Sequence, residues 1–402
     1  MNELSSLGLI LLLALLAGHL VQFLHIPEVT GYILAGVALG PSVLGWVSAE
    51  NLTALEVLSE VALGLILFSI GSVFEFERFR LVGRRIAALT LMESLPAALL
   101  VFLGILLVGQ TWQAAALLGA IAISTAPTST LMVMRECDAK GPLSDALLGI
   151  MAVNNIFCLV VFSLVGAVIE VTSGLGSAGI LAVLYRSGFG LIWELLGSVA
   201  LGFLVGLLLA GWSTKVREAG EMLILLAGSI LICVGAARML ALSPLLASLA
   251  VGATMVNLSR RSRRLFDTLS GTHPPFYAIF FVIAGADLDV SRVSGMGILG
   301  VIYVVARTAG KFFGARWGAQ RLGLPETARH YLGYGLLAHA GLAVGLTLVV
   351  NQRFADFAPP VTVVVLASVV IYEMLGPLGT RFAIVRAGES RVREVRPESI
   401  WT

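Results

Sequence analysis

Charged residues are scarce in this chain. They make up 12% of its 402 residues, whereas hydrophobic residues make up 58%. A soluble domain carries about 25% charged residues, so this chain lacks the polar groups needed to cover a surface that faces water. The composition excludes an ordinary soluble protein and predicts an all-α integral membrane protein whose solvent is the lipid bilayer.

Cysteines and recognisable catalytic motifs are also few. Cys137, Cys158 and Cys233 are scattered without metal-ligand spacing, and we interpret them as small apolar filler. The sequence has no P-loop and no G-x-G-x-x-G pattern, and its polar loops are too short for a nucleotide-binding domain. No nucleophile–base pair stands out. We therefore expect no enzyme activity, no cofactor, no metal site and no nucleic-acid partner.

Long apolar runs separated by short polar loops fill most of the chain. Runs of about 17–25 residues predict membrane-spanning helices, and the first lacks the basic start and cleavage site of a signal peptide. The tenth run is short, and we expect it either to start within the preceding loop at 260–275 or to be partly irregular. About 13 transmembrane helices are expected, at 6–24, 30–47, 54–73, 86–108, 113–134, 143–170, 189–212, 221–237, 239–257, 274–286, 294–315, 329–350 and 360–385.

The basic residues divide unevenly between alternate loops. Of the 26 Lys and Arg residues, 20 fall in one set of loops, four in the other set, and two within a predicted helix. Because basic residues concentrate on the cytoplasmic side of membrane proteins, this asymmetry predicts an outside N-terminus and a cytoplasmic C-terminus. We expect a multi-pass protein of the plasma (inner) membrane with a short cytosolic tail at 387–402.

Two of the predicted helices carry residues that favour a break near mid-membrane. In the fifth, Pro127 removes a backbone hydrogen bond amid hydroxyl side chains that can satisfy the freed groups. In the twelfth, His339 lies beside Gly341, which lowers helical stability. A kinked continuous helix and a structural histidine are the alternatives. Each interrupted helix is the fourth helix of a five-helix unit, the first unit being predicted helices 2–6 and the second 9–13. The two units run in opposite directions through the membrane, which predicts inverted repeats around a midplane site.

Polar and ionisable residues inside the predicted helices are candidate functional residues. Arg307 and Lys311 share one helix face, and charges near the bilayer centre cost about 2.5–3.5 kcal/mol each on insertion scales. Pairing with a buried acid, merely to hold helices together, is the alternative role. The candidate acids within helices are Glu93 and Glu373, whereas Glu60 and Glu194 are expected to be solvated near helix starts. We expect Asp287 and Asp289 at the outer edge of the tenth helix.

Three segments resemble the monovalent cation:proton antiporter-2 family of Kef/NapA-like proteins. They are GYILAGVALGP at 31–41, LGLILFSIG at 63–71, and FFVIAG at 280–285 followed by Asp287. The resemblance implies one membrane transporter unit over 1–402 with a NapA/NhaA-like fold and two broken crossed helices. It further implies a homodimer, dimerisation or scaffold helices at about 1–73 and 189–286, and core transport helices at about 86–170 and 294–386 that move as an elevator.

The chain departs from the family at the site itself. Asn154 and Asn155 stand where the family usually has two acids, or an amide and an acid, and the P-R-G-E segment reads AHAG at 338–341. Lys311 matches the family's core lysine. Asparagine can help to ligate a cation, but it has no proton to exchange.

These observations support a secondary active antiporter of Na⁺ or K⁺ and protons with an atypical site. The predicted contacts of the cation are Asn154, Asn155, Ser124, Thr125, Thr128, Lys311 and His339. The candidates for proton coupling are Lys311, Arg307, Glu93 and Glu373. Two alternatives stay open. One is transport of an anion or organic solute, which fits Arg307 and Lys311 if they have no acid partner and face helix N-termini. The other is a sensor that does not transport.

Overall fold

The computed structural model describes residues 3–24, 26–71, 76–172, 180–216, 218–258, 273–288, 296–339 and 341–391. Every regular element within these ranges is a helix. The helices in chain order are α1 Glu3–Phe23, α2 Glu28–Leu39, α3 Ala49–Gly71, α4 Phe76–Leu107, α5 Trp112–Ala122, α6 Pro127–Glu136, α7 Pro142–Thr172, α8 Ile180–Ser213, α9 Ala219–Met239, α10 Pro244–Leu258, α12 His273–Ala286, α14 Gly297–Arg321, α15 Glu326–Tyr331, η1 Leu332–Leu336, α16 Gly341–Arg353, η2 Ala355–Phe357 and α17 Ala358–Arg386.

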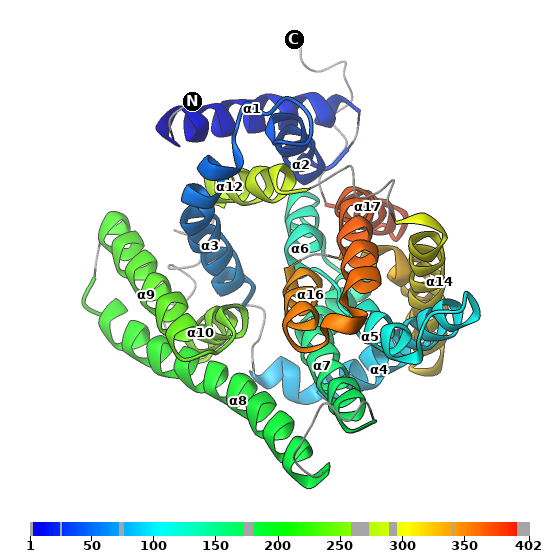
Figure 1. Ribbon diagram of the computed structural model, residues 1–402. Helices are drawn as coiled ribbons and strands as arrows, with labels where there is room; N and C mark the ends of the chain where they lie inside the picture. The colour runs from blue at the N-terminus through cyan, green and yellow to red at the C-terminus, as the bar shows by residue number, and fades with distance from the viewer. Residues whose placement is uncertain are drawn as a thin grey trace.

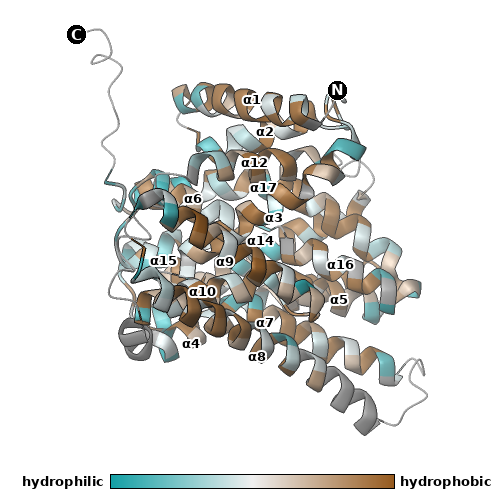
Figure 2. Ribbon diagram, turned by 90° about the vertical axis from the view of Figure 1, so that its left-hand side faces the viewer, coloured by the Kyte–Doolittle hydropathy of each residue, from teal (hydrophilic) through white to brown (hydrophobic). Residues whose placement is uncertain are grey.

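Each expected apolar run coincides with one helix or with a broken helix. Among the described residues, eight stretches are long and apolar enough to cross a bilayer, and five shorter apolar helices accompany them. Large hydrophobic side chains such as Leu12, Leu208 and Ile232 are exposed on α1, α8 and α9, and the hydropathy colours in Figure 2 show such apolar residues along the outer helices. This apolar exterior is what a polytopic membrane protein presents to lipid.

One expectation about the extent of a helix was wrong. The run at 30–47 ends as a helix at Leu39, because Gly40 has an extended backbone with ψ of 172° and precedes Pro41, which disfavours helical geometry in the residue before it. For the tenth run two alternatives were open, and α12 is a regular helix of 14 residues over His273–Ala286 that starts within the preceding loop.

The helices pack as two groups on either side of a central space (Figure 1). In one group, α10 packs on α3 and α8, α12 packs on α2 and α3, and α1 covers α2. In the other group, α14 packs along α4, α5 and α7 pack on α4 and on each other, and α6 and α16 pack on α17. We name these the scaffold group and the core group. The division into dimerisation and core transport regions, and the roles of fixed and moving parts, stay predictions.

Glycines allow several of these helices to approach very closely. A Cβ atom at Gly36 would overlap the carbonyl of Val282 on α12, and one at Gly310 would overlap the backbone of Ala97 on α4. Gly-xxx-Gly spacing permits such backbone contact between membrane helices. Gly345 differs, because a Cβ there would meet no atom within 4 Å. Its spacing from Gly341 therefore marks no close helix contact.

The segment after α17 is tied to the start of α7. The Glu389 carboxylate accepts hydrogen bonds from the Leu143 N–H at 2.7 Å and from the Ser144 N–H at 2.8 Å. The Glu389 carbonyl accepts a further bond from the Lys140 N–H at 3.1 Å. A carboxylate at a helix N-terminus satisfies free N–H groups and interacts favourably with the helix dipole, so this contact anchors the C-terminal segment to the core group.

Candidate functional site

Two interrupted helices cross in the core group. The first breaks between α5, which ends at Ala122, and α6, which begins at Pro127. Proline is well suited to the first position of a helix, because the N–H that it lacks would have no partner there. The second break separates η1 from α16, which begins at Gly341. Both predicted interruptions are therefore confirmed, and the alternative of a kinked continuous fifth helix was wrong.

A backbone hydrogen bond joins the two breaks. The Ala126 N–H donates to the Ala338 carbonyl at 3.0 Å, so the backbone of one break lies directly against the backbone of the other. Backbone groups that leave a helix inside a membrane need such partners, because lipid offers none. The crossing is thus held partly by the main chain itself.

Arg307 satisfies most of the remaining carbonyl oxygens at the crossing. Its guanidinium donates to the Ala122 carbonyl at 3.1 Å, to the Ser124 carbonyl at 2.7 Å and to the Leu337 carbonyl at 2.9 Å. Its Cζ atom lies 4.3 Å from the ring centroid of Tyr372. The side chain is fully buried. Arginine suits this position because its planar group carries five donors, here spread over both breaks.

Lys311 lies one turn further along α14 and pairs with Glu93 of α4. The Lys311 Nζ atom is 2.8 Å from Glu93 Oε2, 2.7 Å from the Ile123 carbonyl oxygen and 2.9 Å from Thr125 Oγ1. The ammonium group has three donors, and all three are used. The second carboxylate oxygen of Glu93 accepts from Ser94 Oγ at 2.7 Å and from Asn154 Nδ2 at 2.5 Å.

These contacts contradict the two conditions on which the anion alternative depended. Lys311 does not lack an acid partner, because it is bonded to Glu93, and both side chains are 0% exposed. Arg307 and Lys311 do not face helix N-termini, because both donate to carbonyls that follow the C-terminal end of α5. That end carries partial negative charge, so the two cations are balanced within the protein. The alternative role, holding helices together with a buried acid, matches this geometry.

His339 lies in the second break and is fully buried. Its Nδ1 atom is 3.1 Å from Ser124 Oγ, and its Nε2 atom is 3.1 Å from the Tyr303 hydroxyl. Both ring nitrogens therefore have partners from other segments. This arrangement agrees with the structural interpretation of the histidine, in which it links the second break to the first break and to α14.

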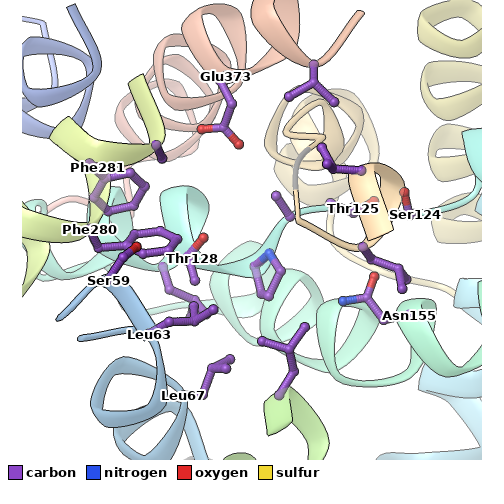
Figure 3. Close-up of a pocket in the computed structure, with 18 of the residues that line it drawn as sticks. Ser59, Leu63, Leu67, Ser124, Thr125, Thr128, Asn155, Phe280, Phe281 and Glu373 are labelled. Carbon is purple, nitrogen blue, oxygen red and sulfur yellow. The ribbon is translucent and has the colours of Figure 1, made fainter. Parts of the chain in front are cut away.

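A cavity of about 480 Å³ lies beside the crossing, between the scaffold and core groups (Figure 3). Among the residues predicted to contact the cation, those that line it are Ser124, Thr125, Thr128 and Asn155, and Pro127 lines it too. Glu373 of α17 also lines it, and Figure 3 shows its carboxylate directed into the open space. The other predicted site residues lie behind the wall and are buried: Asn154, Lys311, His339, Arg307 and Glu93.

The two neighbouring amides of α7 face different surroundings. Successive residues of a helix are rotated by about 100° around its axis, so Asn154 contacts Glu93 and Ser94 while Asn155 lines the cavity. The Asn155 Oδ1 atom is buried and has no hydrogen-bond partner among the described residues. An unpartnered buried carbonyl oxygen is costly in isolation, and it is a suitable ligand for a bound cation or water.

Two further acidic residues line the cavity, and one of them was placed poorly from the sequence. Glu60 was expected to be solvated near a helix start, but α3 begins at Ala49, so Glu60 lies mid-helix, lines the cavity and pairs with Arg238 of α9. Asp287 follows the end of α12, where the sequence predicted it, and also lines the cavity. Asp289 lies outside the described residues. A charged residue within an apolar run indicates a functional position, and Glu60 is such a residue. Because the helix start was predicted too late, Glu60 was interpreted as lying near a helix end.

Crossed broken helices beside a cavity between two helix groups define a secondary transporter with an ion-antiporter fold. The sodium proton antiporter MjNhaP1 from Methanocaldococcus jannaschii has this fold, with a TM-score of 0.71 and 16% identity over 96% of this chain and 99% of that one. The sequence profile described as the transmembrane part of the sodium/hydrogen exchanger matches residues 8–384. The chain therefore belongs to the sodium/hydrogen exchanger family, which is a family of membrane cation/proton antiporters and not of enzymes.

Two curated relatives cover most of the chain. The Ammonium/H(+) antiporter subunit AmhT of Alkalihalophilus pseudofirmus is 23% identical over 88% of this chain and 85% of its own length. The Na(+)/H(+)-K(+) antiporter GerN of Bacillus cereus is 24% identical over 91% of this chain and 93% of its own length. The resemblance found in the sequence motifs is thus confirmed at the level of the family.

Proposed function

We propose that this protein exchanges a monovalent cation for protons across the membrane and binds the cation in the cavity beside the crossed breaks. One observation carries this proposal: in a chain of this family, the cavity wall holds the unpartnered Asn155 oxygen and the Thr128 side chain next to the first break. Two relatives are named for Na⁺, K⁺ or ammonium exchange with protons, which supports a monovalent cation as cargo.

The size of the cavity bears on cation selectivity. A water molecule occupies about 30 Å³, so a cavity of about 480 Å³ holds an ion together with several waters rather than enclosing it in a tight cage. Neutral amide and hydroxyl oxygens then contact the ion alongside water. We expect weak discrimination among Na⁺, K⁺ and ammonium.

Transport of an anion is less well supported. The idea depended on two uncompensated basic side chains in the site, but Lys311 is paired with Glu93 and Arg307 is bonded to main-chain carbonyls. The charged residues among those lining the cavity are the acids Glu60, Asp287 and Glu373. A cavity walled by carboxylates favours a cation.

Alternating access would arise from movement of the core group against the scaffold group. The crossing, Arg307 and Lys311 all belong to the core group, so the site would move as one body. We further propose an outside N-terminus, from the distribution of basic residues, and a homodimer formed by the scaffold group. Labelling an introduced cysteine at Arg386 from one side of the membrane, and measuring the mass of the detergent-solubilised protein, checks these two points.

Transport in proteoliposomes tests the function. Vesicles that contain the purified protein and a trapped pH-sensitive dye receive a pulse of NaCl, KCl or ammonium sulfate, with choline chloride as the control. We expect Na⁺ or K⁺, but not choline, to move protons in the opposite direction. Absence of proton movement with every cation, in vesicles shown to hold folded protein, would contradict the proposal.

A further inference from the structure

Glu373 is the member of the cavity wall whose charge has no partner. It lies near the middle of α17, is only 6% exposed, and is directed into the cavity (Figure 3). Within the described part of the chain, no hydrogen bond or ion pair involves its carboxylate. A buried carboxylate without a partner is strongly unfavourable, so this position needs a cation or a proton, because the part of the chain that the structure describes supplies no positive partner.

The other ionisable groups nearby are already engaged. In the cavity wall, Glu60 pairs with Arg238, and Asp287 lies at the end of α12. On α14, which packs against α17, Lys311 pairs with Glu93 and Arg307 is bonded to carbonyls. Ionisable groups on other elements that contact α17 also have partners, namely His339 with Ser124 and Tyr303, Arg135 with Ser69, Glu136 with Arg381, Glu28 with Tyr32, and Arg353 with Glu170. None of these cations neutralises Glu373.

The same cavity also holds neutral oxygens, across the open space from Glu373 (Figure 3). Among the described residues the Asn155 Oδ1 atom is without a partner, and the Thr128 side chain lies on the cavity wall from α6. A carboxylate, with amide and hydroxyl oxygens on other parts of the wall, suits a Na⁺ or K⁺ ion that keeps part of its water shell. Asn155 itself carries no charge, so Glu373 would supply it.

We propose that Glu373 of α17 is the carboxylate that binds the transported cation. This inference rests on the proposed exchange of a monovalent cation for protons. Glu373 would carry the site's negative charge, and Asn155 and Thr128 would offer neutral oxygens from the facing wall.

The same carboxylate accounts for the exchange. When the cation leaves, the buried charge is neutralised by one proton taken from the water in the cavity, and when that proton leaves, one cation replaces it. Each step exchanges one unit of positive charge for another, so the charge at the site is conserved. The expected exchange is one cation for one proton, without net movement of charge across the membrane.

Cation binding and transport in matched variants test this role. The melting temperature of the purified protein is measured in NaCl, KCl and choline chloride at equal ionic strength, for the wild type, Glu373→Gln, Glu373→Asp and Glu221→Gln. Glu221 is exposed in the first turn of α9 and serves as the control for loss of one carboxylate. We expect Na⁺ or K⁺ to stabilise the wild type and Glu221→Gln, and to have no specific effect on Glu373→Gln.

Transport kinetics separate a ligand from a structural residue. We expect Glu373→Gln to abolish exchange and Glu373→Asp to retain exchange with an apparent KM for the cation about 10–100-fold higher, as for a weakened contact to a charged group. If Glu373→Gln does not fold, the KM of Glu373→Asp decides, and an unchanged value overturns the inference. If folded Glu373→Gln exchanges cations for protons as fast as the wild-type protein does, the inference is also overturned. If the wild-type protein shows no exchange, the proposed function itself is refuted.

Discussion

Lys311 and Glu93 form an ion pair from which water is excluded. Both side chains are 0% exposed, and the Nζ–Oε2 distance is 2.8 Å. Two charges removed from water lose their hydration, and only mutual attraction and further hydrogen bonds compensate for that loss. Here Asn154 and Ser94 on one side, and Thr125 on the other, supply those bonds. The pair thereby connects α4, α7 and α14 to the first break.

Removing the lysine should leave the acid buried without compensation. We expect Lys311→Ala to destabilise the protein by about 3–5 kcal/mol, which is typical when one member of a buried pair is deleted. The loss is measured as a lower denaturation midpoint in detergent. Lys140→Ala is the matched control, because its pair with Asp138 is more than half exposed, and such pairs contribute about 0–1 kcal/mol. Equal effects of the two substitutions would contradict the interpretation.

The partner of Lys311 could not be predicted from the sequence, although the lysine itself was. A charge inside an apolar run is conspicuous wherever it occurs, so Lys311, Glu93 and Glu373 were all recognised as candidates. Which of the acids meets the lysine depends on how helices pack, and Glu93 is 218 positions away from it. No local pattern carries that information.

At the scale of the elements, α14 and α4 pack with their backbones in contact. Gly310 lies against Ala97, and Gly314 lies against Met92 and Glu93, so that a Cβ atom at either glycine would overlap main-chain atoms. This contact positions Lys311, on α14, opposite Glu93, on α4. Close backbone approach is a common basis of helix association in membranes, where the hydrophobic effect contributes little.

A methyl group at this contact should separate the two helices. We expect Gly310→Ala to lower stability by about 1–3 kcal/mol, as overpacking does, and to reduce transport by displacing Arg307 and Lys311. Thermal unfolding and proteoliposome exchange are the measurements. Gly235→Ala on α9 is the control, because a Cβ there meets no atom within 4 Å. A Gly310→Ala variant as stable and active as Gly235→Ala would argue against the contact.

The elements and their breaks were largely predictable, because their causes are local. Apolar length determines which segments span the membrane, and proline or glycine in mid-span weakens the helix where it occurs. Helix starts were less predictable. The start of α3 at Ala49 lies five residues before the expected position, and this difference moved Glu60 from a helix end to the cavity wall. The end of α2 was missed because the apolar run continues past Gly40.

At the scale of the whole molecule, a few polar contacts link the scaffold group to the core group. The Glu28 N–H on α2 donates to the Glu136 carboxylate on α6 at 3.0 Å, and Arg135 on α6 donates to Ser69 on α3. If the core group moves during transport, contacts of this kind must break and re-form in every cycle. Under the proposed movement, they mark where the two groups would slide past each other.

A covalent link at this boundary should stop transport. In a background without Cys137, Cys158 and Cys233, we expect a short cleavable thiosulfonate linker between Glu28→Cys and Glu136→Cys to abolish exchange, and reduction of the linker to restore it. Proteoliposome transport is measured before and after reduction, and each single-cysteine variant receives the same reagent as the control. Full activity in completely cross-linked protein would show that the groups need not move apart here.

The Glu389 contact has a mechanical consequence for whatever follows it in a chain. Because Glu389 is bonded to the first turn of α7, the residue that leads out of the membrane region is attached to the core group rather than to the scaffold group. If the core group moves during transport as proposed, a domain or fusion partner joined after Arg391 would move with it. A bulky partner, or one that binds a fixed surface, would then hinder that movement and slow transport.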